Sequence, residues 1–595
     1  MSSVIRIANC SGYYGDRLSA ARELVEGGPI DVLTGDYLAE LTMSILYDQR
    51  KERGPEAGYV GTFLRQLEDV AATCLAKGIK IVVNAGGLNP AALAAEVERL
   101  LARLNLKARI AWIDGDDLMP DLASLQAAGE TFSNLDTGAS LAEAGQSPVT
   151  ANVYLGAWGI REALERGADI VLCPRVTDAA LVIGPAAWKF GWKRDDYDAL
   201  AGALAAGHII ECGAQACGGN YSFFEEVPSF RNVGYPIAEI EADGSFTITK
   251  HPGTGGLVSV GTVTAQLLYE IGAPAYLNPD VIAHFDTLRM EQAGPDRVRV
   301  TGCRGSSPPP THKVCLNTLG AYKQTLEVLL TGLDIEKKAE VYLDQLFWNL
   351  GGRDGFDQVD VQLIRSDHED PSVNEAAHAS LRVTLVSRNP KRLGRLVAAK
   401  AIELGLATIP GNTGRGAGGF TGAQTIVHWP ALIDSRRVCE RVHIGGAMIE
   451  VAPTQRLDLE AAHAQRGAAE VPACPDGPLR RIAFGRLFGA RSGDKGGSAN
   501  CGVWARSAAS YGFLHAYLTV GRLKILLPDM AGYHIERFEL PNLRALNFVI
   551  HGVLGEGASA NHRIDRQAKS LGEYLRARWI EAPVCLLEEA QLRDE

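Results

Sequence analysis

The chain has 595 residues, of which 46% are hydrophobic and 22% charged, and its formal net charge at pH 7 is -11. This composition is typical of a globular protein of roughly two to four domains. The acidic balance argues against nucleic acid or an anionic membrane as the main partner, and no apolar run reaches the ~18 residues of a membrane span.

The cysteine pattern and the N-terminus bear on the compartment. The 11 cysteines are scattered singly, and their number is odd. A reducing compartment explains this pattern better than a disulfide framework does. Residues 1–9 contain one arginine and no long apolar stretch, so they do not resemble a signal peptide. We therefore expect a cytoplasmic protein.

The first ~190 residues alternate strand-like and helix-like segments. The apolar runs predict strands at 4–8, 29–33, 80–83, 108–113 and 169–172. Apolar residues at helical spacing predict helices at 18–25, 37–48, 60–76, 91–104 and 158–166. Strands separated by helices imply a parallel sheet that helices cover on both faces.

The rest of the chain predicts a mixed insertion and a second domain. Residues ~195–330 are rich in Gly and Pro, and residues ~340–450 are α+β in pattern, with strands at 358–363 and 380–386 and a helix at 390–403. The last ~115 residues predict strands at 481–484 and 549–554 and a helix at 567–579. We therefore divide the chain into a large parallel-sheet α/β domain with a mixed α+β insertion (1–460), a linker (461–478) and a small α+β domain (479–585).

Polar side chains and glycines follow strand after strand in the first domain. Because ligands bind beyond the carboxyl ends of parallel strands, these loops predict a binding site. Ordinary tight turns with side-chain caps are the alternative. The candidate substrate-binding residues here are Cys10, Ser11, Asp36, Asn84, Gly86, Gly87 and Asp114.

Arg175 and Asp178, which follow the last of these strands, are candidate catalytic residues. An arginine can hold a carboxylate or phosphate at two points. An aspartate can act as a base or orient one. The backbone N–H groups of Gly86 and Gly87 are candidates for stabilising an enolate oxygen.

Residues 207–220 place one His, one Glu and two Cys close together. This invites a zinc interpretation, but the spacing fits no closed Cys/His pattern, and we predict no metal. A Gly-rich loop that lines the site would bring His208 and Glu211 into catalysis and Gln215 and Asn220 onto the substrate. A structural turn is the alternative.

Two further loops carry basic residues. Residues 411–416 contain Arg415, a candidate for substrate binding, although a flexible turn is an equal alternative. Residues 490–502 contain four more candidates, Arg491, Asp494, Lys495 and Asn500. This second loop could grip a phosphorylated group or dock the small domain against the first. A strand-to-helix turn capped by Asp494 and Asn500 is the alternative.

The same segments resemble the acyclic terpene utilisation (AtuA) family from about residue 3 to about residue 583. The likeness rests on NCSG (9–12), TGDYLAE (34–40), NAGGLNP (84–90), RVTDA (175–179) and residues 208–220, 253–257 and 491–502. It implies a large AtuA-like domain followed by a ferredoxin-like α+β domain. It also implies a role in the breakdown of citronellol- and geraniol-type terpenes alongside acyl-CoA carboxylases and hydratases. It carries over no catalytic residue.

The leading functional hypothesis is a lyase or hydratase that acts on a branched acyl-CoA and requires no cofactor beyond the CoA moiety of its substrate. A non-catalytic binding or scaffold subunit of an acyl-CoA carboxylase or hydratase pathway is the alternative. Acyl or CoA transfer through a covalent Glu or Cys is a third possibility. The expected partner is a small-molecule acyl-CoA or related acid, with no nucleic acid or membrane, in a homo-oligomer.

Overall fold

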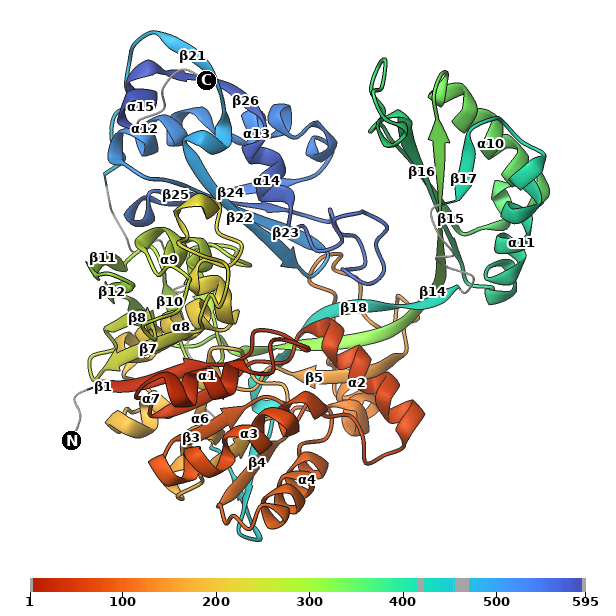
Figure 1. Ribbon diagram of the computed structural model, residues 1–595. Coiled ribbons are helices and arrows are strands. Elements are labelled where there is room, and N and C mark those ends of the chain that lie inside the picture. Colours follow the sequence, from red (N-terminus) through yellow and green to blue (C-terminus); the bar gives the residue numbers. More distant parts are fainter. Residues whose placement is uncertain (1–3, 415–421, 453, 455–469, 591–595) are drawn as a thin grey trace. The chain divides into compact units, whose positions relative to one another are not determined.

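The computed structural model describes residues 4–414, 422–452, 454 and 470–590 (Figure 1). The chain divides into two compact units. Unit 1 comprises residues 1–317, 428–558 and 565–595, and unit 2 comprises residues 318–427 and 559–564. Arg415 and residues 461–469 of the predicted linker lie outside the described residues, and residues 470–478 contain no helix or strand.

A parallel sheet forms the centre of unit 1, as the sequence predicts. Its strands lie in the order β1-β2-β3-β6-β4 and pair in parallel. They are β1 (Val4–Asn9), β2 (Val32–Gly35), β3 (Lys80–Val83), β6 (Ile170–Leu172) and β4 (Ile110–Asp114). Because helices cover both faces, the strands are apolar almost throughout.

Antiparallel strands extend this sheet at both edges, so the whole sheet is mixed. Eleven strands belong to it among the described residues. On the side of β1 they are β7 (Pro236–Glu241), β8 (Phe246–Lys250), β12 (Arg297–Thr301) and β11 (Arg289–Gly294). Beyond β4 lie β19 (Arg441–Ile444) and β20 (Ala447–Glu450). The Gly- and Pro-rich middle of the chain thus contributes to the central sheet.

Two cores lie on opposite faces of the sheet. Successive side chains of a strand point to opposite faces, so Ile7 packs in one core and Ala8 in the other. The first core contains residues of α6 (Trp158–Glu165), α7 (Ala180–Phe190), α8 (Tyr197–Ile210) and α9 (Val260–Leu267). The second contains residues of α1 (Ala20–Gly27), α2 (Glu40–Arg53), α3 (Gly61–Lys77) and α4 (Pro90–Arg103).

Smaller elements complete this part of unit 1. They are α5 (Leu122–Ala127), β5 (Pro148–Val153), which pairs with β14, and a three-stranded sheet of β13 (Arg304–Ser306), β10 (Ile282–His284) and β9 (Ala275–Leu277).

The C-terminal part of unit 1 is an antiparallel sheet with helices. Its order is β22-β23-β25-β24, with β22 (Phe488–Lys495), β23 (Ser498–Ala505), β25 (Ala545–Ile550) and β24 (Ile535–Leu540). A second sheet pairs β21 (Leu479–Ala483) with β26 (Trp579–Pro583). The helices are α12 (Ala508–Tyr517), α13 (Val520–Leu526), α14 (Leu571–Arg576) and α15 (Val584–Glu589). The helix predicted at 567–579 is shorter, since Trp579 begins β26.

The segment 490–502, predicted as a loop, is mostly the hairpin β22–β23. Its glycines stand where neighbours leave no space for a side chain. A Cβ at Gly493 would lie 2.6 Å from the Tyr269 ring, and one at Gly502 would lie 2.5 Å from Leu268 Cβ. The glycines therefore serve close packing in a strand, and the prediction of a loop was wrong.

Unit 2 contains an antiparallel sheet and two helices. Its strands are β15 (Gln358–Ile364), β16 (His378–Ser387) and β17 (Asn412–Gly414), with parts of β14 (Thr311–Thr331) and β18 (Ala423–Asp434). Its helices α10 (Ile335–Asn349) and α11 (Arg395–Glu403) pack on this sheet. The strands predicted at 358–363 and 380–386 are confirmed.

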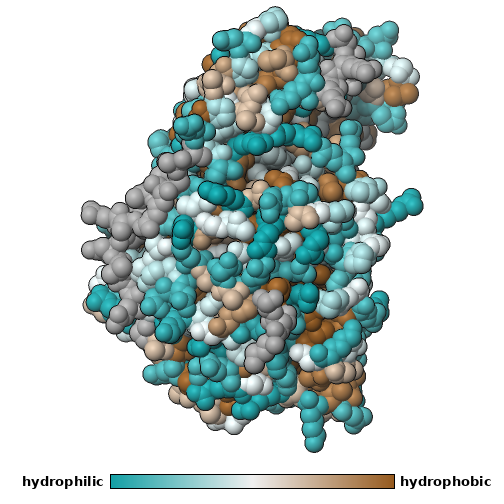
Figure 2. Space-filling model, turned by 90° about the vertical axis from the view of Figure 1, so that its left-hand side faces the viewer, coloured by the Kyte–Doolittle hydropathy of each residue, from teal (hydrophilic) through white to brown (hydrophobic). Residues whose placement is uncertain are grey.

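No helix among the described residues is long and apolar enough to cross a membrane. Hydrophilic residues predominate on the face that Figure 2 shows, and its hydrophobic residues occur in scattered patches.

A buried carboxylate, Asp280, and a half-buried one, Glu440, cap the N-terminus of α6. Both oxygens of Asp280 lie 3.0 Å from the Ala157 nitrogen, and Glu440 Oε1 accepts a hydrogen bond from the Gly159 nitrogen at 3.1 Å. Acidic groups are favoured at this end of a helix. Burial, followed by the charge of Asp280, nevertheless raises the pKa of Glu440 to about 8.

This raised pKa predicts a pH-dependent effect of Glu440→Gln. Between the unfolded pKa of about 4.3 and the folded pKa of about 8, wild-type stability falls as pH rises, because unfolding releases a proton from Glu440. The variant lacks this loss, so its stability relative to wild type should rise by about 2 to 4 kcal/mol between about pH 5 and about pH 8. Urea unfolding of both proteins at both pH values measures this change in relative stability. Equal pH dependence in both proteins would contradict the raised pKa, and exposed Glu450→Gln is the control.

Candidate functional site

The ends of the parallel strands and the end of α8 meet in one polar cluster. Asn9, the last residue of β1, donates hydrogen bonds of 2.8 Å from Nδ2 to the carbonyls of Ser11, Ile210 and Glu211. His208 was predicted in a loop but lies in the last turn of α8, and Glu211 is the residue that directly follows this helix. This contact brings the 207–211 segment to the strand ends that the sequence singled out.

Arg175 is the fixed cation of the cluster. It is buried, and its Nη1 donates hydrogen bonds of 3.0 Å to Leu38 O and to Asp178 Oδ1. Its guanidinium lies 4.3 Å from the centre of the Tyr154 ring. Burial alone would lower the pKa of Arg175, but Tyr154 and the surrounding carboxylates raise it well above its usual value.

Two buried carboxyl groups stand near this cation. Burial, with the charges of Asp178 and Glu211, raises the pKa of Asp36 well above its usual value, and Asn84 Nδ2 donates to Asp36 Oδ1. Burial, with the charge of Asp178, likewise raises the pKa of Glu211. Asp36, Asn84 and Glu211 thus lie together, as predicted, but the two carboxyl groups tend to hold protons.

His208 is neutral beside Glu211. Burial lowers the pKa of His208 to about 4, and its Nδ1 lies 3.3 Å from Glu211 Oε1. The ring also packs against Tyr276 at 5.0 Å and Phe285 at 5.6 Å. The Nδ1 atom makes no hydrogen bond to Glu211, so burial leaves the imidazole neutral beside a carboxyl group whose own pKa is raised.

Asp178 is more exposed than the buried carboxyl groups of Asp36 and Glu211. Its side chain is 31% exposed. Burial raises the pKa of Asp178, against the opposing charge of Arg175. A carboxyl group that is open to solvent, oriented by an arginine and shifted toward neutral pH suits a general base or acid.

A second set of residues, which the sequence analysis did not select, adjoins Arg175. Tyr154 OH donates a 2.6 Å hydrogen bond to Glu40 Oε1, and Lys313 Nζ lies 3.3 Å from the same oxygen. Burial alone would raise the pKa of Glu40. The charges of Lys313, His428 and Arg175 outweigh this effect, so the pKa lies well below its usual value. Glu40 is the last residue of the TGDYLAE segment, and this segment was the one feature of the sequence that could have pointed to Glu40 as a site residue.

The carboxyl groups of Asp178 and Glu40, whose side chains are 31% and 29% exposed, have opposite pKa shifts. The pKa of Asp178 is raised and that of Glu40 is lowered. Paired titratable groups whose environments separate their pKa values are the usual arrangement for proton transfer.

Buried polar atoms without partners mark the same place. Arg175 Nε, Thr177 Oγ1 and His428 Nε2 are buried and have no hydrogen-bond partner among the described residues. Such atoms are rare in proteins, and a group that belongs to a ligand is one explanation for several of them at one site.

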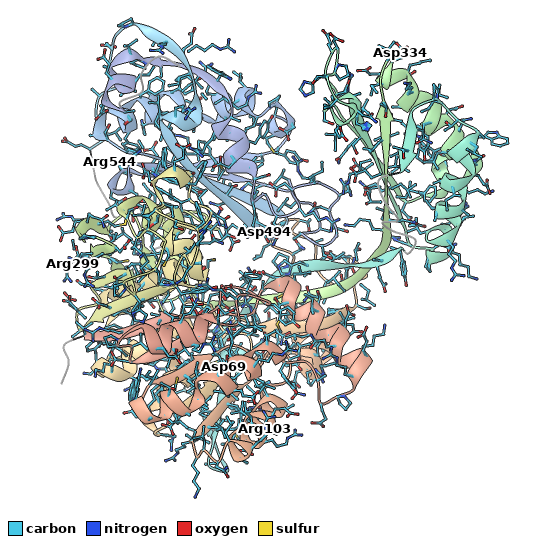
Figure 3. All side chains as sticks on the ribbon, in the orientation of Figure 1. Asp69, Arg103, Arg299, Asp334, Asp494 and Arg544 are labelled. Atoms are coloured by element: carbon cyan, nitrogen blue, oxygen red, sulfur yellow. The ribbon has the colours of Figure 1, made fainter. Side chains whose placement is uncertain are left out.

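The hairpin β22–β23 carries Asp494 and Lys495 close enough to Glu40 of the cluster for its charge to shift the pKa values of both; Figure 3 labels Asp494. Asp136 holds the hairpin end, because Gly497 N donates to its Oδ2 at 2.9 Å and Ser498 Oγ donates to its Oδ1 at 3.3 Å. The two candidate residues stand just before this anchored turn.

Both residues have pKa values near neutral pH. Burial and the charge of Glu270 raise the pKa of Asp494 to about 7. Lys495 is an exposed residue, but protein atoms crowd around it. This desolvation, followed by the charge of Lys313, lowers the pKa of Lys495 to about 8. Glu40 acts on both pKa values, so the hairpin shares the electrostatic field of the first cluster.

Gly86 and Gly87 do not have the role predicted for them. The Gly86 N–H donates to Cys173 O at 3.0 Å, and the Gly87 N–H donates to Asn84 O at 3.3 Å. Neither is free to stabilise an enolate oxygen.

Three other predicted residues have structural partners. Asp114 Oδ1 accepts a hydrogen bond of 2.6 Å from Arg441 Nε, which joins β4 to β19. Asp116, two residues further on, contacts the cluster in place of Asp114, because its Oδ2 accepts a hydrogen bond from Arg175 N at 3.3 Å. Ser11 Oγ donates to a backbone carbonyl, and burial raises the pKa of the Cys10 thiol to about 12, so Cys10 is a poor nucleophile.

Comparison with known proteins decides the family. The model of the acyclic terpene utilisation family protein AtuA matches residues 5–444, and the model of the AtuA ferredoxin-like domain matches residues 478–581. The chain belongs to the AtuA family. Family membership gives it a role in acyclic terpene utilisation. No curated protein and no solved structure matches it significantly.

The two AtuA family domains dock through buried polar contacts. Asn500 is fully buried, accepts a hydrogen bond from Glu270 N at 2.8 Å and donates to Leu268 O and to Asn547. Arg491 donates to Gln215 and lies over the Tyr269 ring. Asn500, Arg491 and Gln215, predicted to bind substrate, therefore join the ferredoxin-like domain to the first domain.

The remaining predictions near residues 208–220 are explained by backbone geometry. Asn220 is exposed and has a φ of 56°, a left-handed conformation that Asn tolerates well. Among the described residues, no group of three converging ligand atoms includes His208, Cys212 or Cys217.

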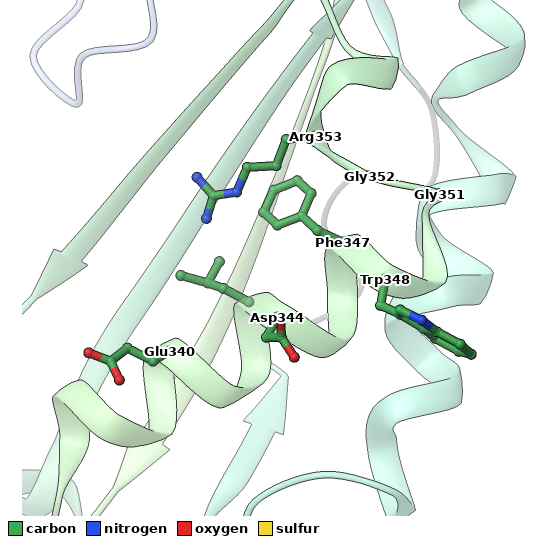
Figure 4. A pocket seen from close by; sticks show the side chains of 8 residues that line it. Glu340, Asp344, Phe347, Trp348, Gly351, Gly352 and Arg353 are labelled. Carbon is green, nitrogen blue, oxygen red and sulfur yellow. The ribbon is translucent and has the colours of Figure 1, made fainter.

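A pocket of about 740 Å³ lies in unit 2, and none of the predicted site residues that the structure describes lines it (Figure 4). It lies along α10, and the guanidinium of Arg353 is 4.5 Å from the centre of the Phe347 ring. Its lining contains two carboxylates but no nucleophile–base pair.

Proposed function

We propose that this AtuA protein is an enzyme that acts as a lyase or hydratase on a branched acyl-CoA. In the proposed dehydration, loss of the proton next to the thioester gives an enolate, and the β-hydroxyl group then leaves as water; hydration is the reverse, and the proposed lyase reaction breaks a bond at the same β-carbon through the same enolate. A base must move a proton at the carbon next to the thioester, and a cation must stabilise the negative charge on the thioester oxygen. The observation that carries the proposal is the accessible Asp178 carboxyl group beside Arg175 in a cluster with oppositely shifted pKa values.

Asp178 would take or return the proton. Arg175 fixes its orientation through the 3.0 Å hydrogen bond. Lys495 replaces the glycine N–H groups as the candidate for the thioester oxygen, because it is an exposed residue in the same electrostatic field and makes no hydrogen bond among the described residues. Lys313 is the second available cation, with a side chain that is 41% exposed.

The choice of a CoA ester rests on the family. AtuA proteins are linked to the breakdown of citronellol- and geraniol-type terpenes, alongside enzymes that handle acyl-CoA esters. A covalent route through a cysteine is less well supported, since burial raises the pKa of both the Cys10 and the Cys315 thiols to about 12.

A thermal shift experiment tests the ligand class. The probes are free CoA, the CoA esters of citronellic and geranic acids, octanoyl-CoA as a straight-chain control, and free citronellic acid. A branched ester at a hundredfold excess over its Kd should stabilise the protein by about 2.7 kcal/mol. Lys313→Met should lose the shift, and Lys107→Met, which removes an exposed lysine, should keep it.

Two outcomes would contradict the proposal. A shift with the free acid but with no CoA species would exclude the thioester. No shift with any probe, together with co-purification of a partner enzyme, would favour the non-catalytic scaffold.

A further inference from the structure

Three side chains that can bind metal converge on the ferredoxin-like domain. They are His534, Glu536 and His551, whose ligand atoms all lie within 4.8 Å of one another. No other group of three or more His, Cys, Asp or Glu side chains meets this condition in the part of the chain that the structure describes. None of them belongs to the site around Arg175.

The strand register explains why these side chains share one face. Strands β24 and β25 are antiparallel, and Ile535 pairs with Ile550. Both isoleucines are buried in the core of this domain. Since side chains alternate between faces, His534, Glu536 and His551 point away from that core. His551 N donates to His534 O at 2.9 Å, so the two histidines lie directly opposite each other.

The side chains are already close to a chelating arrangement. Glu536 Oε2 lies 2.7 Å from His551 Nε2, and the two imidazole rings are 5.1 Å apart. β24 is an edge strand of its sheet. His534 and Glu536 are exposed, which leaves space for water as an additional ligand.

We propose that His534, Glu536 and His551 form a binding site for Zn²⁺ or a similar divalent transition-metal ion, with water in the open position. Two imidazoles and one carboxylate form a donor set that zinc uses in proteins. Mg²⁺ and Ca²⁺ prefer sites made only of oxygen ligands and should bind poorly. The proposal does not depend on the reaction.

The location links this site to the hairpin that carries Lys495. His551 precedes Gly552, whose N–H donates to Ser498 Oγ at 3.2 Å. Two residues further on, Leu554 N donates to Gly497 O at 2.8 Å. The segment that leaves the metal site thus holds the end of β22–β23. A bound ion would fix the start of this segment and stabilise the hairpin.

The test measures metal binding directly. Tag-free protein is stripped with a chelator and titrated calorimetrically with Zn²⁺, and then with Co²⁺, whose visible absorption reports its coordination geometry. We expect one ion per chain at micromolar affinity and a higher Tm with Zn²⁺ but not with Mg²⁺. His551→Gln and Glu536→Gln should each weaken binding at least ~10-fold, since even loss of an outer partner of a metal ligand costs 10–100-fold.

His515→Gln is the matched control, because His515 pairs with Glu539 at 2.8 Å in the same domain but belongs to no three-ligand group within the described part of the chain. It should leave zinc binding unchanged. No zinc binding, or binding that survives both His551→Gln and Glu536→Gln with unaltered affinity, would overturn the proposal. Circular dichroism confirms that the variants are folded, and Glu536→Gln preserves side-chain size.

Discussion

Asp178→Asn should lower the rate of proton exchange next to the thioester by about a hundredfold to ten-thousandfold, the usual contribution of a general base. Asparagine keeps the size of the side chain and can still accept the hydrogen bond from Arg175, but it cannot take a proton. The measurement is incorporation of solvent deuterium at the α-carbon of the CoA ester of citronellic acid, followed by mass spectrometry. This readout requires no knowledge of the complete reaction.

The matched control for this variant is Asp198→Asn. Asp198 also pairs with an arginine, Arg304, but both side chains are largely exposed and neither belongs to the cluster. The Asp198→Asn variant should exchange deuterium at the same rate as the wild-type protein. A loss of less than tenfold in Asp178→Asn would remove Asp178 as the base and direct attention to Glu40 and Glu211.

Lys495→Met should lower kcat/KM by about a hundredfold to a thousandfold, the range found when one donor to a developing oxyanion is removed. The pKa of about 8 predicts a pH dependence. Lys495 is a cation below this pH and neutral above it, so the wild-type rate should fall as pH rises through about 8. Arginine stays charged, and Lys495→Arg should move this fall to higher pH. Rate profiles of the three proteins measure both effects.

Lys107→Met controls for the loss of one positive charge and should behave as wild type. If Lys495→Met lost activity but Lys495→Arg kept the wild-type alkaline fall, another group would be responsible for the pH dependence. Lys495 would then serve binding or packing instead of charge stabilisation.

The central sheet could be predicted because its strands are short, continuous apolar runs bounded by turn residues. β3 begins and ends where the sequence predicts, and β1 differs by one residue. The antiparallel extension could not be predicted, since β19 and β20 lie more than three hundred residues after β4 in the sequence. Nothing local in residues 441–450 indicates that they join this sheet.

The candidate site could be predicted in part. Arg175 and Asp178 follow a buried strand, and the rule that ligands bind beyond strand ends selected them. Tyr154 and Lys313 could not be selected, because no motif surrounds them and only the fold brings them to Glu40. The role of Asn500 could not be predicted for the same reason. Its burial against residues 268–270 depends on how the two domains dock, which no local sequence pattern shows.

The glycine-rich segment 490–502 shows why composition misled. Glycine predicts loops because it accepts conformations that other residues avoid. Here Gly493 and Gly502 occupy strands, and their lack of a side chain admits Tyr269 and Leu268. Asp494 and Lys495 reach the cluster because a rigid hairpin, not a flexible loop, carries them.

This placement of Lys495 has a consequence for biosynthesis. A chain emerging from the ribosome exposes Asp36, Arg175 and Asp178 long before Lys495 has been translated. At ~10 residues per second, the interval between Asp178 and Lys495 is on the order of half a minute. During that time the nascent protein carries Asp178, the proposed base, and Arg175, but it lacks Lys495. We therefore expect unfinished chains to be inactive, so that activity begins only when translation is almost complete.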